Sequence, residues 1–283
     1  MRIALIQNRE SGSGEAGRVE AVLASLGADV VAFAVDRARD AGDCGADRIA
    51  VAGGDGSIGC AAEAAAAADV PLAVIATGTA NDLAGHLELP TALDEACRLA
   101  VEGTEIERID LARASGRPFV NAAGAGLPPA AAEQAADMKD RLGPLAYPLG
   151  ALSASAGAEP IRCSVEVDGV TVFSGDAWQA SVAASGAFGA GASFNADPAD
   201  GELDVIAIEA GSRARLVKHA FGLRIGEVES QEGVHSARGR GIVMRVDPGE
   251  KLNIDGEIVT AGELDPAGEL SFAVAGGFGL IVG

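Results

Sequence analysis

Glycine and aspartate occur together in two short segments, and both residue types have a use in phosphate chemistry. Gly53 to Ser57 reads GGDGS and follows an apolar run, and Gly78 to Asp82 reads GTAND and follows another. Glycine lets backbone N–H groups approach a phosphate closely, and a helix that begins there adds favourable partial charge. These turns are therefore candidates for binding nucleotide phosphates, although tight strand-to-helix turns alone would also explain the glycines.

Asp55 and Asp82 bring a carboxylate to each of these turns. Because each follows an apolar run, both are expected at the same edge of a sheet. A carboxylate repels phosphate, and a divalent cation or ordered water between the two groups would resolve the conflict, as in phosphoryl transfer. A lone aspartate in such a turn is also a common N-cap, so Asp55 is alternatively the cap of the helix expected at 57–68.

Two more groups of acidic residues lie later in the chain. Oxygen-rich loops can hold Mg²⁺ or Ca²⁺, and a charged turn before a strand explains the first group equally well. In the second group, Asp255 and Glu257 fall in a segment whose pattern indicates a hairpin turn. The first group lies within eight residues: Asp197, Asp200, Glu202 and Asp204.

The elements that must position these residues change in kind near residue 114. Before it, short apolar runs alternate with helical patterns, which predicts βαβ units and a parallel sheet. After it, period-two alternation predicts antiparallel strands, with Asp168-Gly169 as one hairpin turn. We therefore predict a doubly wound α/β domain at 1–114 and an antiparallel β-rich domain at 115–265, with 266–283 packing back on the first. Finer expectations are one strand at 117–126 and helices at 129–156 and 213–223.

The composition excludes several classes of protein. The chain has 283 residues, 48% of them hydrophobic and 22% charged, as in ordinary soluble proteins. A net charge of −20 argues against nucleic-acid binding and against stable electrostatic docking on an anionic membrane. Four cysteines without a C-x-x-C spacing indicate reduced thiols and a cytoplasmic location. No signal peptide or membrane-spanning run is recognisable.

Together these motifs resemble the catalytic domain of the diacylglycerol kinase and lipid kinase family, which includes sphingosine and ceramide kinases. GGDG alone is shared with NAD kinases and 6-phosphofructokinases, whereas its combination with GTAND, DG-x-LD and DGE is specific. The resemblance covers nearly the whole chain, in family order. The matching segments are GGDGS (53–57), PLAVIATGTANDLA (71–84), IDLARASGRPFVNAAGAGL (109–127), KDRLGPLAYPLGAL (139–152), ADPADGELDV (196–205) and DGE (255–257).

The resemblance implies an N-terminal nucleotide-binding domain, a C-terminal β-sandwich that takes the lipid, and an active site between them. It implies that Asp82 joins Asp55 in a water and magnesium network, and that Asp255 is the general base with Glu257 near it. Asp200, with the carbonyl oxygens of Asp197 and Glu202, would form a structural Mg²⁺ or Ca²⁺ site. The residues implied in ATP binding are Asn8, Gly53, Gly54, Asp55, Gly56, Ser57, Gly78, Thr79 and Asn81.

The implied reaction is in-line attack of a lipid hydroxyl on the γ-phosphate of ATP, with Mg²⁺ as cofactor. The implied partners are a diacylglycerol-like alcohol, a transient peripheral contact with the membrane, and a second copy of the chain in a homodimer. The cytoplasm is the expected compartment, and no nucleic acid is expected.

Several positions depart from the family pattern. Gly85 stands where an arginine is expected beside the phosphates, a type of contact that is worth several kcal/mol in some transition states. Arg9 and Ala76 each stand where the family has proline. Two alternatives therefore stay open. One is a catalytically weak or inactive protein that binds nucleotide or lipid, and the other is an NAD kinase-like enzyme.

Overall fold

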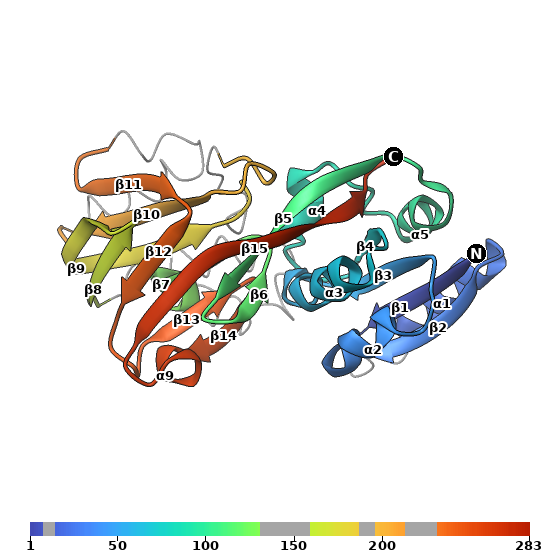
Figure 1. Cartoon of the computed structure of the whole chain (residues 1–283), viewed down its shortest axis with the longest axis horizontal. Helices are drawn as coiled ribbons and strands as arrows, with labels where there is room; N and C mark the ends of the chain where they lie inside the picture. Colours follow the sequence, from blue (N-terminus) through green and yellow to red (C-terminus); the bar gives the residue numbers. More distant parts are fainter. Residues whose placement is uncertain (8–14, 131–158, 187–195, 213–230) are drawn as a thin grey trace. The chain divides into compact units, whose positions relative to one another are not determined.

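The computed structural model describes residues 1–7, 15–130, 159–186, 196–212 and 231–283 (Figure 1). Contacts within the chain define two units, each with its own core. The first comprises Met1–Leu111 together with Gly276–Gly283, and the second comprises Ala112–Ala275. The helices expected at 129–156 and 213–223 lie almost wholly outside the described residues. No described helix is long and apolar enough to cross a membrane.

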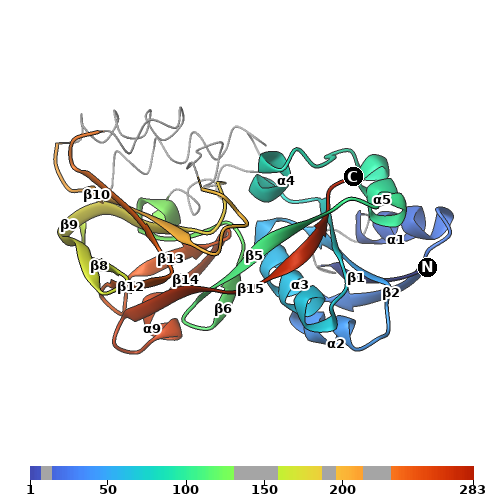
Figure 2. The same cartoon turned by 45° about the horizontal axis from the view of Figure 1, so that its top comes forward.

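The first unit is a parallel sheet with helices on both faces, as the alternation of apolar runs and helical patterns predicted (Figure 2). Its strands lie in the order β4-β3-β1-β2. The elements are β1 (Arg2–Gln7), α1 (Glu15–Ser25), β2 (Asp29–Ala34), η1 (Val35–Arg37), α2 (Ala38–Gly42), β3 (Arg48–Gly53), α3 (Asp55–Ala68), β4 (Leu72–Ala76), α4 (Asp82–His86) and α5 (Leu93–Glu102).

The strand order reverses direction between β1 and β3. The chain passes from β1 to β2 on one side and then places β3 on the other side of β1. In doubly wound sheets, ligands bind outside the carboxyl ends of the strands at such a switch point. Here these carboxyl ends are Gln7 of β1 and Gly53 of β3. Gln7 pairs with Ala52, the residue before Gly53, so the two strands end side by side.

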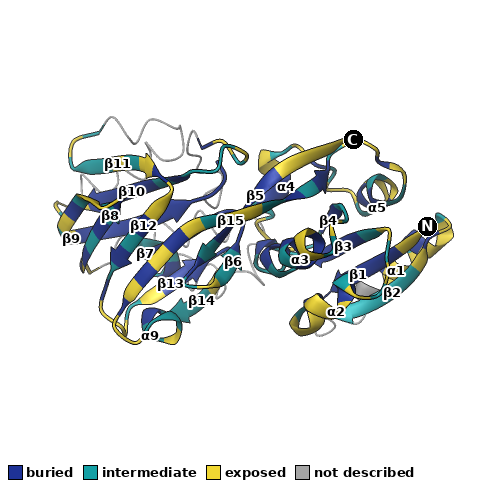
Figure 3. Ribbon diagram, viewed as in Figure 1, coloured by how far each residue is buried: buried dark blue, intermediate teal, exposed yellow. Residues whose placement is uncertain are grey.

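The core of the first unit is built from small aliphatic side chains, because the chain has few aromatic residues. Ile3 and Leu5 of β1 pack with Val19 and Leu23 of α1 and with the alanines of α5. Figure 3 shows β1 and β3 as almost continuously buried strands. Burial on both faces explains why these strands read as uninterrupted apolar runs in the sequence.

The second unit is a β-sandwich made of antiparallel strands, so the predicted antiparallel β-rich fold is confirmed. The unit boundary passes through its first and last strands. The elements are β5 (Ile106–Ala114), β6 (Arg117–Phe119), β7 (Ala122–Gly126), β8 (Ile161–Val167), β9 (Val170–Ala183), β10 (Leu203–Glu209), β11 (Val234–Gly239), β12 (Gly241–Arg245), β13 (Lys251–Ile254), β14 (Glu257–Thr260), α9 (Ala261–Leu264) and β15 (Glu269–Ile281).

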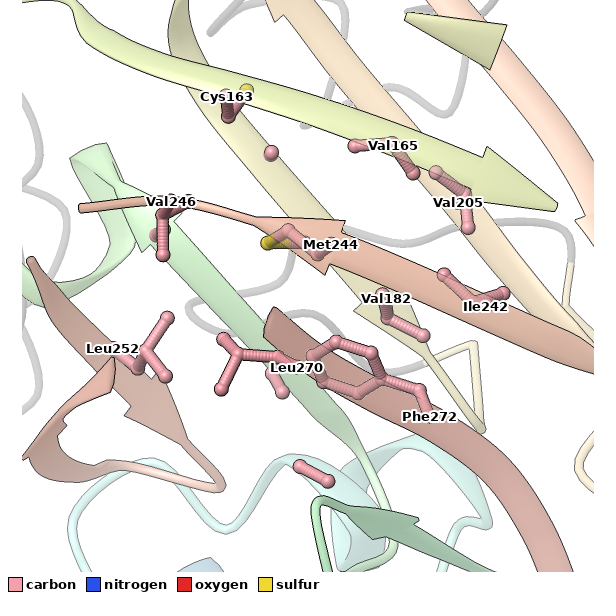
Figure 4. Packing of buried hydrophobic residues seen from close by; sticks show 14 of the residues in the cluster. Cys163, Val165, Val182, Val205, Ile242, Met244, Val246, Leu252, Leu270 and Phe272 are labelled. Atoms are coloured by element: carbon pink, nitrogen blue, oxygen red, sulfur yellow. The ribbon is translucent and has the colours of Figure 1, made fainter. Parts of the chain in front are cut away.

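The long strand β9 belongs to both layers of the sandwich. Its first half pairs with β8, which continues through β12 to β15. Its second half pairs with β7 on one side and β10 on the other, and β7 continues to β13 and β14. Val165, Val182, Ile242, Leu252 and Phe272 fill the space between the layers (Figure 4).

Two local expectations had different outcomes. The turn at Asp168-Gly169 is confirmed, since both residues have positive φ and join β8 to β9. The single strand expected at 117–126 is wrong, because the chain leaves the extended pattern at Val120 and Asn121 and so forms β6 and β7. The backbone N–H groups at this break bind a side chain from another loop, described below.

Candidate functional site

The two glycine-rich turns of the first unit touch each other. A Cβ atom placed on Gly78 would lie 2.4 Å from the Cα of Gly54, and one placed on Gly54 would lie 3.2 Å from the Cα of Gly78. The N–H of Thr77 also donates to the carbonyl of Gly53 at 3.0 Å. Glycine is therefore required here by the close approach of two backbones. As a result, the turns after β3 and β4 pack directly against each other at the carboxyl edge of the sheet.

Ser57 and Asn81 fix the shapes of these turns from within. The Ser57 hydroxyl donates to the carbonyl of Gly54 at 2.7 Å. Asn81 adopts the left-handed conformation, and its side-chain amide accepts from the N–H of Gly78 at 2.9 Å and donates to the carbonyl of Gly78 at 3.1 Å. Gly78 and Thr79 are exposed. The backbone between them is therefore both rigidly held and open to a ligand.

Asp55 ties the first turn to the helix that follows the second. The residue is 8% exposed, and its carboxylate accepts from the N–H of Asp82 at 3.0 Å and from the N–H of Leu83 at 3.1 Å. It thus serves as the N-terminal cap of α4, whose own preceding residue, Asn81, makes no side-chain cap bond. The sequence had suggested a cap for the helix at 57–68 instead. That helix already begins at Asp55, with Gly54 in the cap position.

One buried polar side chain at this edge, that of Gln7, was not predicted from the sequence to belong to the site. Gln7 ends the otherwise apolar β1 and is 4% exposed, yet its side-chain oxygen has no hydrogen-bond partner in the described structure. A buried amide oxygen without a partner costs free energy, so this atom is an acceptor suited to a ligand or a water molecule at the switch point. A single polar residue closing an apolar strand is the signal that could have identified it. The neighbouring Asn8 lies outside the described residues.

In the second unit, Asp255 occupies the turn between β13 and β14. Ile254 pairs with Glu257, so Asp255 and Gly256 form a two-residue loop, and both have positive φ. This is the hairpin turn that the sequence indicated, with the Asp-Gly pair favoured there. The turn is buried at Asp255, which is 8% exposed. A local turn propensity alone does not require such burial.

The carboxylate of Asp255 binds three consecutive backbone N–H groups. Its Oδ2 accepts from Val120 at 2.7 Å, and its Oδ1 accepts from Asn121 at 2.9 Å and from Ala122 at 3.0 Å. In return, the N–H of Asp255 donates to the carbonyl of Ala122 at 3.0 Å. Charge-assisted bonds of this kind stabilise the carboxylate anion. They also explain the break between β6 and β7, because the N–H groups there are turned toward Asp255.

The polar groups around this turn are themselves bonded. Glu257 is exposed and forms an ion pair with Arg117. The buried Asn121 side chain accepts from the hydroxyl of Ser185 at 3.1 Å. The side-chain oxygen of Asn253 accepts from the N–H of Gly256 at 2.8 Å. Asp255 therefore lies in a pre-organised polar environment within an otherwise apolar sandwich.

The acidic loop before β10 surrounds an arginine. Asp197 accepts from the N–H of Ala199 at 3.0 Å, and Asp200 accepts from the N–H of Glu202 at 2.9 Å. Arg238 of β11 forms ion pairs with Asp200, with Glu202 and with Asp204 of β10. Among the described residues, no group of three or more His, Cys, Asp or Glu side chains is placed to hold a metal ion. Asp200, the carboxylate that the resemblance implied as a metal ligand, is paired with Arg238 in this fold, and the implied metal site stays a prediction.

The two buried cysteines offer no alternative chemistry. None of the four cysteines, all of which are described, forms a disulfide, and burial raises the pKa of Cys97 and of Cys163 to about 11. Neither thiol forms the thiolate of a nucleophile at neutral pH. The chemistry of the described chain therefore rests on its carboxylates and backbone turns.

Two family models match the chain. The diacylglycerol kinase catalytic domain matches residues 2–114, and the YegS C-terminal NAD kinase beta sandwich-like domain matches residues 121–267. The chain belongs to this diacylglycerol kinase and YegS-type lipid kinase family. The paired turns lie in the first match, and Asp255 and the acidic loop lie in the second.

Individual proteins of the family agree with this assignment. A diacylglycerol kinase of Mycobacterium tuberculosis is 28% identical over 235 residues, which are 77% of this chain and 76% of that protein. A probable YegS-like lipid kinase of Shewanella frigidimarina is 35% identical over 46% of this chain and 43% of its own length. A putative diacylglycerol kinase structure from Bacillus anthracis superimposes with a TM-score of 0.74 at 21% identity, covering 99% and 96% of the two chains. That likeness concerns the fold.

Replacing Asp55 by alanine tests whether its carboxylate holds the start of α4. We expect Asp55→Ala to lower the free energy of unfolding by about 1–3 kcal/mol, because one buried and one partly buried N–H group lose their acceptor. Asp94→Ala, at an exposed site in the first turn of α5, is the control and should change it by less than about 1 kcal/mol. Urea unfolding followed by circular dichroism measures both. Equal stability of Asp55→Ala and the wild type would contradict the capping role.

Proposed function

We propose that this protein transfers the γ-phosphate of ATP to the hydroxyl group of a diacylglycerol-like lipid. Membership of the diacylglycerol kinase and YegS-type lipid kinase family supports kinase-type phosphate transfer. The observation that carries the nucleotide part is the backbone contact between Gly54 and Gly78, fixed by Asp55 at the carboxyl edge of the sheet. Such an edge is where doubly wound sheets bind ligands.

In this proposal the ATP phosphates bind the two turns through backbone N–H groups. The N-terminus of α3, a helix of 14 residues, supplies N–H groups without intrahelical partners and a favourable partial charge. Gly78 and Thr79 supply the exposed backbone of the second turn. Mg²⁺ typically binds through phosphate oxygens, water and one or two carboxylates, and neutralises charge on the phosphates. Asp82, in the first turn of α4, is the carboxylate suited to hold it, directly or through water.

Asp255 is proposed to receive the proton of the lipid hydroxyl. Its burial and its three backbone N–H partners hold its carboxylate in one orientation. Phosphoryl transfer depends mainly on positioning and charge neutralisation. An oriented carboxylate that accepts a hydrogen bond from the attacking hydroxyl is therefore suited to this role.

The lipid, the membrane contact and the homodimer are parts of the same proposal. A diacylglycerol is embedded in a bilayer, and a chain with a net charge of −20 is repelled by anionic headgroups. Contact must then be made by apolar side chains, by a local basic patch or through a cation bridge. Because sequence identity to the named kinases is low, the identity of the lipid substrate has to be found by a direct screen of lipids.

The catalytic role of Asp255 can be separated from its structural role, because the chain offers a matched control. Asp168 also occupies an Asp-Gly hairpin turn with positive φ, and its carboxylate also accepts from backbone N–H groups, those of Arg240 and Gly241. We expect Asp255→Asn to lower the rate of phosphate transfer at least about a hundredfold. Asp168→Asn should leave the rate within about twofold, whatever its effect on stability.

The measurement is transfer of label from [γ-³²P]ATP, with Mg²⁺, to vesicles that contain diacylglycerol, ceramide or sphingosine. Thermal melts of each variant show that it is folded at the assay temperature. A folded Asp255→Asn variant that retains the wild-type rate would contradict the proposal for Asp255.

The second candidate function is nucleotide binding without transfer, and Gly85 is the observation that favours it. Gly85 is exposed in α4, and a Cβ atom placed on it has nothing within 4 Å, so an arginine side chain fits there. If the proposed transfer is limited by the missing cation, Gly85→Arg should raise the rate by about tenfold, or 1.4 kcal/mol. Gly85→Ala is the control and should not raise it.

Two outcomes of the Gly85 experiment are decisive. A rate increase only in Gly85→Arg supports a kinase that lacks one phosphate contact. ATP binding with no transfer to any lipid, in the wild type and in Gly85→Arg, favours the binding protein. A yeast NADH kinase structure superimposes with a TM-score of 0.52 at 12% identity, which is a likeness of fold and gives no reason to prefer a dinucleotide substrate.

A further inference from the structure

Arg238 lies at the centre of the acidic loop that precedes β10. It stands directly opposite Asp204 in the antiparallel register of β10 and β11. Its guanidinium is hydrogen-bonded to Asp200, and its Nε lies 3.6 Å from Oε2 of Glu202 and 3.7 Å from Oδ2 of Asp204. Three carboxylates from one segment thus converge on a single cation that the chain itself supplies.

This convergence needs a positive charge at its centre. The side chains of Asp200 and Asp204 are only 25% and 21% exposed, so water screens their mutual repulsion incompletely. A guanidinium presents several N–H donors in a fixed fork and can satisfy more than one carboxylate at once. Arg240, the other nearby cation, is 78% exposed and contacts only Glu202 in this group, at 3.7 Å.

We infer that Arg238 takes the place of a divalent cation in the loop 197–204. The backbone of that loop is already turned by Asp197 and Asp200, each of which accepts an N–H from two residues further along. The turn of this backbone is therefore fixed within the segment itself, by bonds that do not involve Arg238. The second unit folds without a structural metal, and removal of Arg238 exposes a site with the oxygen ligands that Ca²⁺ or Mg²⁺ prefers. This inference does not depend on the proposed kinase activity.

The test compares Arg238→Gln with the wild type in thermal melts, at matched ionic strength, with EDTA, MgCl₂ or CaCl₂. We expect Arg238→Gln to melt several degrees lower in EDTA, and millimolar Ca²⁺ to restore about 3 °C or more by binding the folded state. The wild type should melt at the same temperature in all three solutions. Arg162→Gln is the matched control, because Arg162 forms an exposed ion pair with Asp176 in the same unit.

Titration calorimetry with CaCl₂ on the nucleotide-free protein gives a second readout. Arg238→Gln should bind one Ca²⁺, and the double variant Asp200→Asn/Arg238→Gln should bind none. The inference is overturned if a folded Arg238→Gln variant gains no cation dependence. It is also overturned if the wild type binds one Ca²⁺ that Asp200→Asn abolishes. Should Arg238→Gln fail to fold in every solution, the wild-type titration alone decides between these outcomes.

Discussion

In each unit, a buried carboxylate binds backbone N–H groups of a segment that is distant in the sequence. Asp55 binds the N–H groups of residues 82 and 83, and Asp255 binds those of residues 120 to 122. Buried N–H groups outside regular secondary structure need an acceptor, and a carboxylate can satisfy two or three at once. The shapes of the loops that carry the candidate chemistry depend on these bonds.

This arrangement gives these residues a structural role beside the chemical role that is proposed for them. The three N–H groups that bind Asp255 fix the orientation of its carboxylate as well as the shape of the segment at residues 120 to 122. A loss of activity at such a residue mixes the two effects. Asp168 is an internal control that separates the two effects. It lies in the same kind of turn and accepts the same kind of backbone hydrogen bond, and no chemical role is proposed for it.

The sequence was sufficient wherever the governing pattern is local. Apolar runs ending at Gln7, Gly53 and Ala76 predicted the parallel strands, and Asp168-Gly169 predicted a hairpin. The partners of Asp55 and Asp255 could not be predicted, because they lie 27 or more positions away in the sequence and depend on which turns become neighbours. The ion pairs of Arg238 could not be predicted for the same reason. The acidic residues around it are visible as a group, whereas the cation that neutralises them comes from the next strand of the fold.

The central claim is that the two touching turns of the first unit hold the phosphates of ATP. Titration calorimetry with Mg²⁺ and a non-hydrolysable ATP analogue tests it most directly, on the wild type, Gly78→Ala and Gly85→Ala. A Cβ on Gly78 must push the turns apart, whereas one on Gly85 meets open space. The account predicts that the wild type and Gly85→Ala bind alike and that Gly78→Ala, still folded, binds at least about tenfold more weakly, a loss of 1.4 kcal/mol. A folded Gly78→Ala variant with wild-type affinity, or a wild type that binds no nucleotide, would contradict it.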